Sequence, residues 1–201
     1  MSERPDARVS GGFVLLAAWF AACSGWRAAL LVFTAAAVHE AGHLLVLRLF
    51  HAPVRAFRLG VFGAALTVDA GALTYGEELL AVLAGPLANL LAALAFAASG
   101  RTLAAGAHGV LCAFNLLPIR PLDGGRALFL FLSFCFGPTA AERGCRVAGT
   151  VFSLALLAAV VAVMAESGGS LWLLPAAAGA FSALAREALP EECKISRIFV
   201  K

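Results

Sequence analysis

Two histidines and a glutamate form the most chemically distinctive group in this chain. His39, Glu40 and His43 belong to the motif His-Glu-Ala-Gly-His, which lies inside an apolar run over residues 28–50. Histidines four residues apart share one face of a helix, about one turn apart, so both rings can reach one metal ion. The carboxylate between them can then face a water molecule bound to that ion. The alternative is a pair of structural histidines that face a neighbouring helix.

The composition places this motif in a membrane. Of the 201 residues, 62% are apolar and 13% are charged, and the mean hydropathy is +0.92. Soluble domains are typically about half apolar and a quarter charged, so the composition indicates a polytopic membrane protein. Ionisable groups at membrane depth are costly unless they are paired or functional, which favours a functional site. The net charge of +3 is small and its basic residues are scattered, so nucleic-acid binding is not expected.

The apolar runs predict an all-α polytopic membrane protein with about six transmembrane helices. A span needs about 20 apolar residues, so the first and the sixth are short. Trp19, Phe20 and Trp26 favour a first span with an interfacial anchor over a cleavable signal peptide. The predicted spans are 12–24, 27–50, 78–99, a fourth that begins at about 103 and is broken at 118–125, and then 147–165 and 171–184. The apolar residues 128–136 after the break either finish the fourth helix or return to the interface.

The positions of the basic residues predict the orientation of these spans. The outer turns hold only Arg27 and Arg101. Because cytosolic loops carry the excess of Lys and Arg, both termini of this multi-pass protein are expected in the cytosol. The inner segments hold eleven basic residues, namely Arg4, Arg8, Arg48, Arg55, Arg58, Arg143, Arg146, Arg186, Lys194, Arg197 and Lys201.

One short region after the second span is typical of β-structure. Residues 57–62 and 65–69 are bounded by glycines and are too short for a transmembrane helix. They predict a small interfacial β-hairpin at the cytosolic membrane surface. An edge strand there could pair with an extended substrate, because a peptide bond must leave its helix before a metal can reach it. A plain interfacial loop is the alternative.

A third metal ligand is expected in the broken fourth helix. Residues 118–125 place two prolines and two glycines around Asp123, and such a break is tolerated at membrane depth only where it lines a polar cavity. A catalytic zinc site uses three protein ligands and leaves one position for water. The sequence therefore predicts one Zn²⁺ per chain on His39, His43 and Asp123. An ion pair of Asp123 with Arg120 or Arg126 is the alternative.

Other potential ligands fit less well. His108, Cys112 and Asn115 share one helical face, but His108 lies about 10 Å from Asn115, so a satisfied interfacial histidine is favoured over a further ligand. The cysteines form no C-x-x-C pair, and we expect neither a disulfide nor a Cys ligand. The five cysteines are Cys23, Cys112, Cys135, Cys145 and Cys193.

Three motifs together resemble the site-2 protease family of intramembrane zinc metalloproteases (peptidase M50). They are the His-Glu-Ala-Gly-His motif, Gly-Pro-Leu-Ala-Asn at residues 85–89, and residues 115–125 with their Leu-Asp-Gly. The likeness is greatest to the bacterial branch typified by the stage IV sporulation protease, which processes a membrane-associated sigma-factor precursor. It implies that Glu40 is the catalytic general base and then the acid, in cleavage of a peptide bond in or near a membrane-associated segment.

The same resemblance implies substrate-binding roles for three further residues. Asn115 matches a family position near the substrate path and could donate a hydrogen bond to the scissile carbonyl. Pro86 and Asn89 match a motif that shapes the substrate cavity. The alternative is that Pro86 is a helix break and that Asn89 makes an interhelical hydrogen bond.

The resemblance also implies an integral protein of the bacterial inner or cell membrane, and it sets the expected organisation. We expect a single integral-membrane metalloprotease domain over residues 1–201 with its catalytic core at about 28–136, and neither a PDZ domain nor a C-terminal nucleotide-sensing domain. The expected partners are a membrane-associated protein substrate, such as a sigma-factor precursor or another membrane-tethered regulator, the lipid bilayer, and a membrane regulatory protein.

Two other classes of protein stay open as alternatives. The first is a membrane zinc-binding or transport protein, although no second half of the chain echoes the first as transporter repeats do. The second is a non-catalytic relative that binds a partner helix, which would be expected to have lost Glu40 or Asp123.

Overall fold

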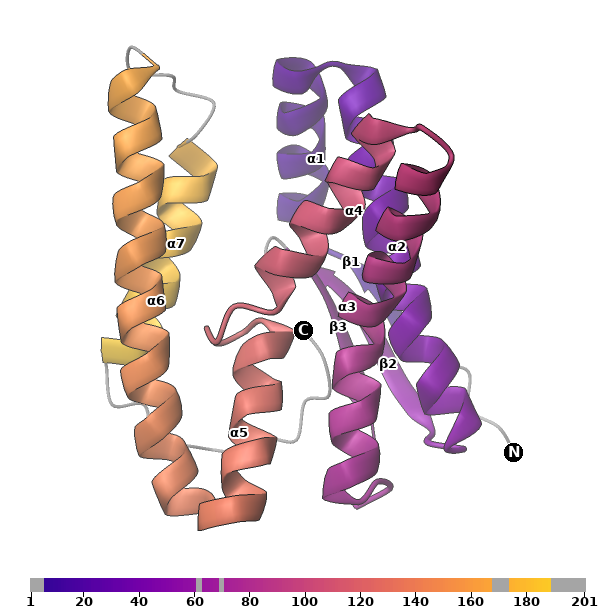
Figure 1. The fold of residues 1–201 in the computed structure, drawn as a ribbon, viewed down its shortest axis with the longest axis vertical. Coiled ribbons are helices and arrows are strands. Elements are labelled where there is room, and N and C mark those ends of the chain that lie inside the picture. Colours follow the sequence, from indigo (N-terminus) through magenta and orange to yellow (C-terminus); the bar gives the residue numbers. More distant parts are fainter. Residues whose placement is uncertain (1–5, 61–62, 69–70, 168–173, 189–201) are drawn as a thin grey trace. The chain divides into compact units, whose positions relative to one another are not determined.

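The computed structural model describes residues 6–60, 63–68, 71–167 and 174–188 (Figure 1). The described chain forms two compact units, one ending at Leu116 and the other beginning at Leu117. The expectation of a single domain over residues 1–201 stays a prediction. Several residues used in the sequence analysis lie outside the described residues, namely Arg4, Cys193, Lys194, Arg197 and Lys201.

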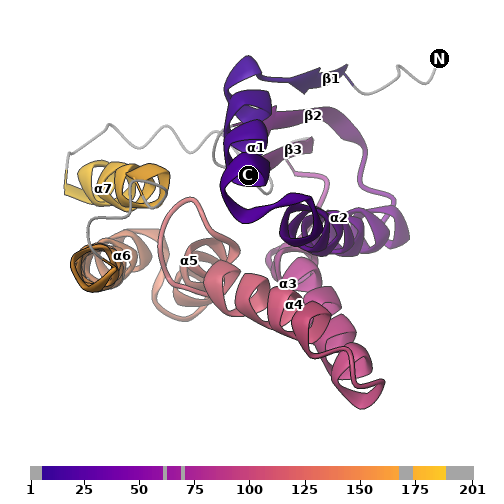
Figure 2. The same ribbon diagram turned by 90° about the horizontal axis from the view of Figure 1, so that it is seen from above.

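Four helices form most of the first unit: α1 (Gly11–Ser24), α2 (Trp26–Leu49), α3 (Tyr75–Ala98) and α4 (Thr102–Asn115). α2 packs against α3, and α3 packs against α4, side by side in Figures 1 and 2. Gly25, with φ +80°, makes the sharp turn between α1 and α2, because a glycine adopts positive φ without a steric penalty. The α2 helix therefore starts directly at Trp26. The guanidinium carbon of Arg27 lies 5.5 Å from the centroid of the Trp26 ring.

The start of α3 is fixed by a capping box. The Thr74 hydroxyl accepts a hydrogen bond from the Glu77 N–H at 3.4 Å, and the Glu77 carboxylate accepts one from the Thr74 N–H at 2.8 Å. These reciprocal bonds satisfy two N–H groups that would otherwise lack helical partners. They define where α3 leaves the loop that follows the sheet.

A three-stranded sheet joins these helices, with strand order β1-β2-β3. The predicted hairpin is present as β2 (Val54–Gly60) and β3 (Gly63–Val68), which pair antiparallel. β1 (Asp6–Val9) pairs parallel to β2 and was not predicted. Four residues are too few to display the alternating pattern of a strand, and the charges of this segment suggested a membrane flank instead. Figure 2 shows the sheet beside α1, which contacts β2.

The second unit contains three helices: α5 (Asp123–Phe136), α6 (Pro138–Glu166) and α7 (Leu174–Ala188). α6 packs against both α5 and α7. Its buried face carries small residues at four-residue intervals, which lets neighbouring helices approach closely. These residues are Ala141, Cys145, Gly149 and Ser153. The sequence placed the fifth span at 147–165, but α6 begins at Pro138, because charged residues such as Arg143 end an apolar run without ending a helix.

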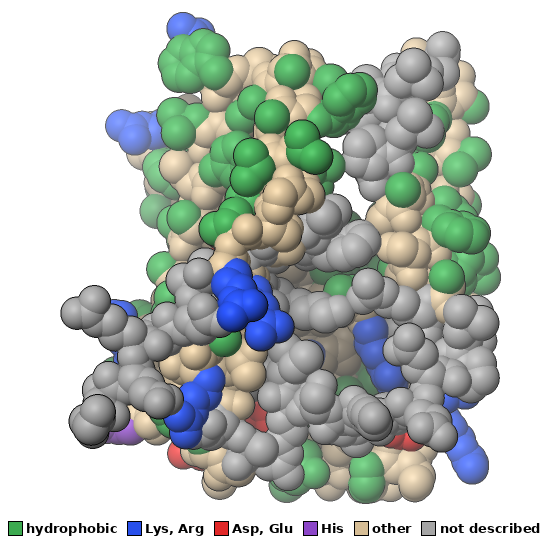
Figure 3. Space-filling view, turned by 180° about the vertical axis from the view of Figure 1, so that it is seen from behind, with side chains coloured by type: hydrophobic (Ala, Val, Ile, Leu, Met, Phe, Trp, Pro, Cys, Tyr) green, Lys and Arg blue, Asp and Glu red, His purple; other side chains and the backbone are tan. Residues whose placement is uncertain are grey.

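Three described helices are long and apolar enough to cross a membrane: α2, α3 and α6. The apolar α1 has 14 residues, and the six-span count stays a prediction. The fourth predicted span is interrupted as expected, since α4 ends at Asn115 and α5 begins at Asp123. Large apolar side chains are exposed along the helices, for example Leu45, Leu91 and Val151. Figure 3 shows hydrophobic side chains spread over the helix surfaces, which suits contact with lipid.

Candidate metal centre

α2 places His39 and His43 on one buried face. Their side chains are 5% and 0% exposed, and their rings meet edge to face with centroids 4.7 Å apart. The two Nε2 atoms lie 3.1 Å from each other. Two nitrogens bound to one tetrahedral zinc ion, each at about 2.0–2.1 Å, lie about 3.3 Å apart. The pair therefore has nearly the spacing of two ligands of one zinc ion.

The tautomer of His43 is set by α3. Its Nδ1 lies 2.7 Å from the Ala81 carbonyl oxygen, which can only accept a hydrogen bond. A neutral His43 therefore carries its proton on Nδ1 and presents a lone pair at Nε2. This contact with a backbone carbonyl is the usual way in which a protein orients a metal-binding imidazole. The types of donor atom and the orientation of His43 thus fit a zinc ion.

Two glycines let α2 and α3 approach closely enough for these contacts. A Cβ at Gly85 would overlap the His43 ring, and one at Gly42 would lie 2.6 Å from the Ala84 carbonyl oxygen. Only a residue without a side chain leaves this space at Gly85. The first glycine of the Gly-Pro-Leu-Ala-Asn motif thus has a direct part in placing a histidine, a role that sequence reasoning missed.

Pro86 is fully buried inside α3. Because proline has no N–H, the Val82 carbonyl, next to the Ala81 carbonyl that contacts His43, loses its usual helical partner. The predicted contribution of Pro86 to substrate binding stays a prediction.

Asn89 lies between two histidines from different helices. Its Nδ2 is 3.4 Å from His39 Nδ1, and its Oδ1 is 2.9 Å from Nδ1 of His108 on α4. Asn89 is 0% exposed and His108 is 3% exposed, with the His108 ring 5.3 Å from that of Phe96. These contacts are interhelical, as the alternative for Asn89 expected, while its contact with substrate stays a prediction. The short turn at 99–101 indicates that α3 and α4 are antiparallel neighbours, but it does not show that Asn89 meets His108.

Glu40 follows His39 on α2 and is half-buried, with its carboxylate Oε2 buried. Its position between the two histidines in the sequence puts it on the adjoining side of the same helical turn. Its predicted role as general base stays a prediction at this stage.

Asn115 is the last residue of α4 and is half-buried. Its Nδ2 donates to the Leu111 carbonyl at 3.0 Å, one turn earlier in the helix. The amide is thereby held at the point where the helix ends. Its contact with substrate stays a prediction.

Asp123 belongs to the second unit, where it is the first residue of α5 and 4% exposed. The turn before it packs onto the helix start, because a Cβ at Gly125 would lie 2.6 Å from the Ile119 carbonyl oxygen. The Leu122 N–H also donates to that oxygen at 2.8 Å. Backbone contacts therefore fix the position of this carboxylate within its own unit. Its role as third ligand, and the alternative of an ion pair with Arg120 or Arg126, stay open.

Comparisons with known proteins agree with this description. No family model matches the chain. It is 30% identical over 181 residues to the "Putative zinc metalloprotease Rip3" of Mycobacterium tuberculosis, in both strains Erdman and H37Rv. The alignment covers 81% of this chain and 45% of that protein, so the chain spans about half the length of the curated relatives it matches.

The fold has a solved counterpart. The "Site-2 Protease from Methanocaldococcus jannaschii" superimposes with a TM-score of 0.67 and 20% sequence identity, over 96% of this chain and 95% of that one. The chain thus has the fold of this site-2 protease. Together, the fold and the similarity to the zinc metalloprotease relatives support an assignment of the chain to the site-2 protease family, peptidase M50.

Proposed function

We propose that this protein is an intramembrane zinc metalloendopeptidase that hydrolyses a peptide bond in or near a membrane-associated segment of a substrate protein. One observation carries the proposal. Two buried histidines on α2, a helix apolar and long enough to cross a membrane, face each other through Nε2 atoms 3.1 Å apart. The two Nε2 atoms thus meet at nearly the separation of two nitrogens bound to one zinc ion, and a proton on one of them can take the place of the cation when no metal is bound.

The proposed ligands are His39, His43 and Asp123, for one Zn²⁺ per chain. All three are buried, and each offers one ligand atom of a type that zinc binds. When bound, zinc supplies Lewis acidity and lowers the pKa of the attacking water. His43 is oriented for this role by the Ala81 carbonyl.

Glu40 is the proposed proton carrier. Its carboxylate accepts a proton from the attacking water and then returns that proton to the nitrogen of the leaving amine. Asn115 is proposed to donate its amide N–H to the scissile carbonyl or to the backbone of the substrate. Pro86 and Asn89 are proposed to shape the cavity that receives the substrate.

The sheet offers a way to hold an extended substrate. Within the described residues, β1 and β3 each pair only with β2, so they form the two outer edges. An edge strand presents N–H and C=O groups that an extended peptide can pair with. We propose a membrane-tethered regulator, such as a sigma-factor precursor, as the substrate, with a membrane regulatory protein as a further partner.

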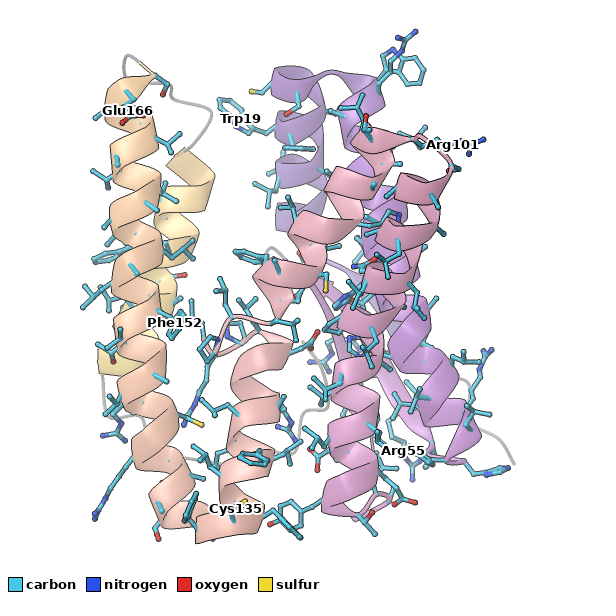
Figure 4. All side chains as sticks on the ribbon, in the orientation of Figure 1. Trp19, Arg55, Arg101, Cys135, Phe152 and Glu166 are labelled. Atoms are coloured by element: carbon cyan, nitrogen blue, oxygen red, sulfur yellow. The ribbon has the colours of Figure 1, made fainter. Side chains whose placement is uncertain are left out.

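The orientation proposed from the basic residues places both termini in the cytosol of a bacterium. Figure 4 labels Arg101 at one end of the first unit and Arg55 toward its other end. Arg48, at the end of α2, and Arg58, on β2, accompany Arg55. Cysteine substitutions at residues 55 and 101, labelled with an impermeant reagent, should react from the cytosolic and the outer side respectively. Labelling of both from one side would contradict this orientation.

The activity is tested with purified protein, its metal content and a membrane-tethered peptide substrate. We expect wild-type protein to cleave the peptide, a chelator to stop cleavage, and zinc to restore it. Glu40→Gln should keep zinc and lose turnover by about 10²–10⁴-fold, because it removes the proton acceptor alone. A zinc-transport protein or a non-catalytic relative would show no wild-type cleavage that depends on Glu40, and that result would overturn the proposal.

A further inference from the structure

The nitrogen of His39 that points away from His43 contacts Asn89. In the structure the Asn89 amide presents its NH₂ group to His39 Nδ1 at 3.4 Å and its oxygen to His108 Nδ1 at 2.9 Å. An NH₂ group can only donate, so His39 Nδ1 accepts in this arrangement and its proton lies on Nε2. By the same logic, His108 carries its proton on Nδ1, which donates to the Asn89 oxygen.

This tautomer of His39 cannot bind a metal through Nε2, since that nitrogen carries the proton. The metal-binding tautomer has its proton on Nδ1 and needs an acceptor there. Asn89 can provide one by turning its amide through 180°, which exchanges the positions of oxygen and NH₂ with almost no change in shape. Its NH₂ group then faces His108 Nδ1, which must become an acceptor, so the His108 proton lies on Nε2.

We propose that Asn89 and His108 are positioning residues that couple the tautomer of a metal ligand to a histidine on a neighbouring helix. The network has two arrangements, one compatible with metal on His39 and one not. Each imidazole carries one proton in both arrangements, so the change gains or loses no proton overall. The inference rests on the proposed zinc site and adds to it the residues that select the binding tautomer.

Burial explains why the two ends of the network must change together. Asn89 is 0% exposed and His108 is 3% exposed, so bulk water does not reach them to compensate for a mismatched hydrogen bond. A buried donor that faces a donor is costly, which disfavours mixed arrangements. Partners that orient a metal-binding histidine in this way typically affect metal affinity by about 10–100-fold.

The first test is zinc affinity of the full-length protein, measured by chelator competition in lipid nanodiscs. Asn89→Leu removes both polar groups at similar volume, and we expect zinc affinity to fall by about 10–100-fold. Asn89→Asp places only acceptor oxygens at His39 Nδ1 and should bind zinc at least as tightly as the wild type. Cys112→Ala is the matched control, since Cys112 is buried one turn after His108 on α4 but makes none of these bonds.

The second test observes the tautomers directly. With ¹⁵N-labelled histidine, solid-state NMR should show the His108 proton on Nδ1 without zinc and on Nε2 with zinc, and this change should vanish in Asn89→Leu. Unchanged zinc affinity in Asn89→Leu, or one His108 tautomer in both states, would overturn the network while leaving the zinc site intact. A wild-type protein that binds no zinc would overturn both the network and the proposed function.

Discussion

The histidines and the aspartate of the proposed site are kept in position by different kinds of contact. In the first unit, His43 is oriented by side-chain hydrogen bonding to α3 and by the space over Gly85. In the second unit, Asp123 begins a 14-residue helix whose first turn packs against the backbone at Ile119. The imidazoles therefore depend on a neighbouring helix for their orientation, whereas the carboxylate depends on the turn that precedes it. Substitutions that disturb only the contact with α3, or only the turn before Asp123, can show how much zinc binding depends on each.

Removing a ligand from either side should have the largest effect. His43→Ala and Asp123→Ala should each lose most of the bound zinc during dialysis, because a site with two protein ligands holds the ion far more weakly. Zinc content per chain, measured by mass spectrometry, checks this, with Glu166→Ala as a control at the exposed end of α6. Full occupancy in Asp123→Ala would show that the carboxylate is not a zinc ligand.

A methyl group at Gly85 should have the next largest effect. Gly85→Ala places a Cβ against the His43 ring, so we expect zinc affinity to fall by about 10–100-fold, the equivalent of the 1–3 kcal/mol that overpacking costs. Chelator competition measures the change. Gly76→Ala is the matched control on the same helix, since its Cβ would meet nothing within 4 Å. Equal affinities for the two variants would contradict the proposed role of this contact.

The equivalent substitution beside Asp123 is Gly125→Ala. It should lower zinc affinity less than Gly85→Ala does, and it should destabilise the local fold more. Gly125→Ala would bring a Cβ to 2.6 Å from the Ile119 carbonyl oxygen, which requires the turn to shift. We expect a loss of stability of about 1–3 kcal/mol and a fall in zinc affinity of up to about tenfold. Denaturant unfolding and chelator competition measure the two effects, with Gly179→Ala on α7 as control. A variant with normal stability and no zinc would show that the site depends on Gly125 in another way.

The smallest effect on zinc is expected at Asn115, which separates metal binding from turnover. Asn115→Ala should leave zinc content unchanged and lower the rate by about 10²-fold, because it removes one hydrogen bond that strengthens in the transition state. Parallel zinc and cleavage assays provide the comparison. Loss of zinc would instead make Asn115 a structural support for Asp123, and an unchanged rate would exclude its contact with the substrate.

The sequence predicts best those features that depend on local spacing. The four-residue interval between His39 and His43 is enough to put both on one helix face, and the structure buries them together. The prolines and glycines at 118–125 predict an interruption, and α4 and α5 flank one at 116–122. Both features follow from backbone geometry within a few residues.

Features that depend on contacts between distant segments were not predictable in the same way. β1 becomes a strand only because β2, almost fifty residues later, provides its hydrogen-bond partners. The contact of Asn89 with His108 requires the relative rotation of α3 and α4, which apolar residues around both helices leave undefined. The space over Gly85 depends on where α2 crosses α3, and no pattern within α3 alone reveals it.

The start of α2 bears on the depth of the proposed metal site in the membrane. Trp26 is exposed with the Arg27 guanidinium beside its ring, a combination suited to the headgroup layer. His39 follows thirteen residues later, which at about 1.5 Å per residue is about 20 Å along the helix. In a hydrocarbon layer about 30 Å thick, His39 would lie about 10 Å from the opposite surface, and His43, one turn further on, about 5 Å from it. The number of residues between Trp26 and His39 would thus determine the depth in the membrane at which the proposed substrate must present the bond to be cleaved.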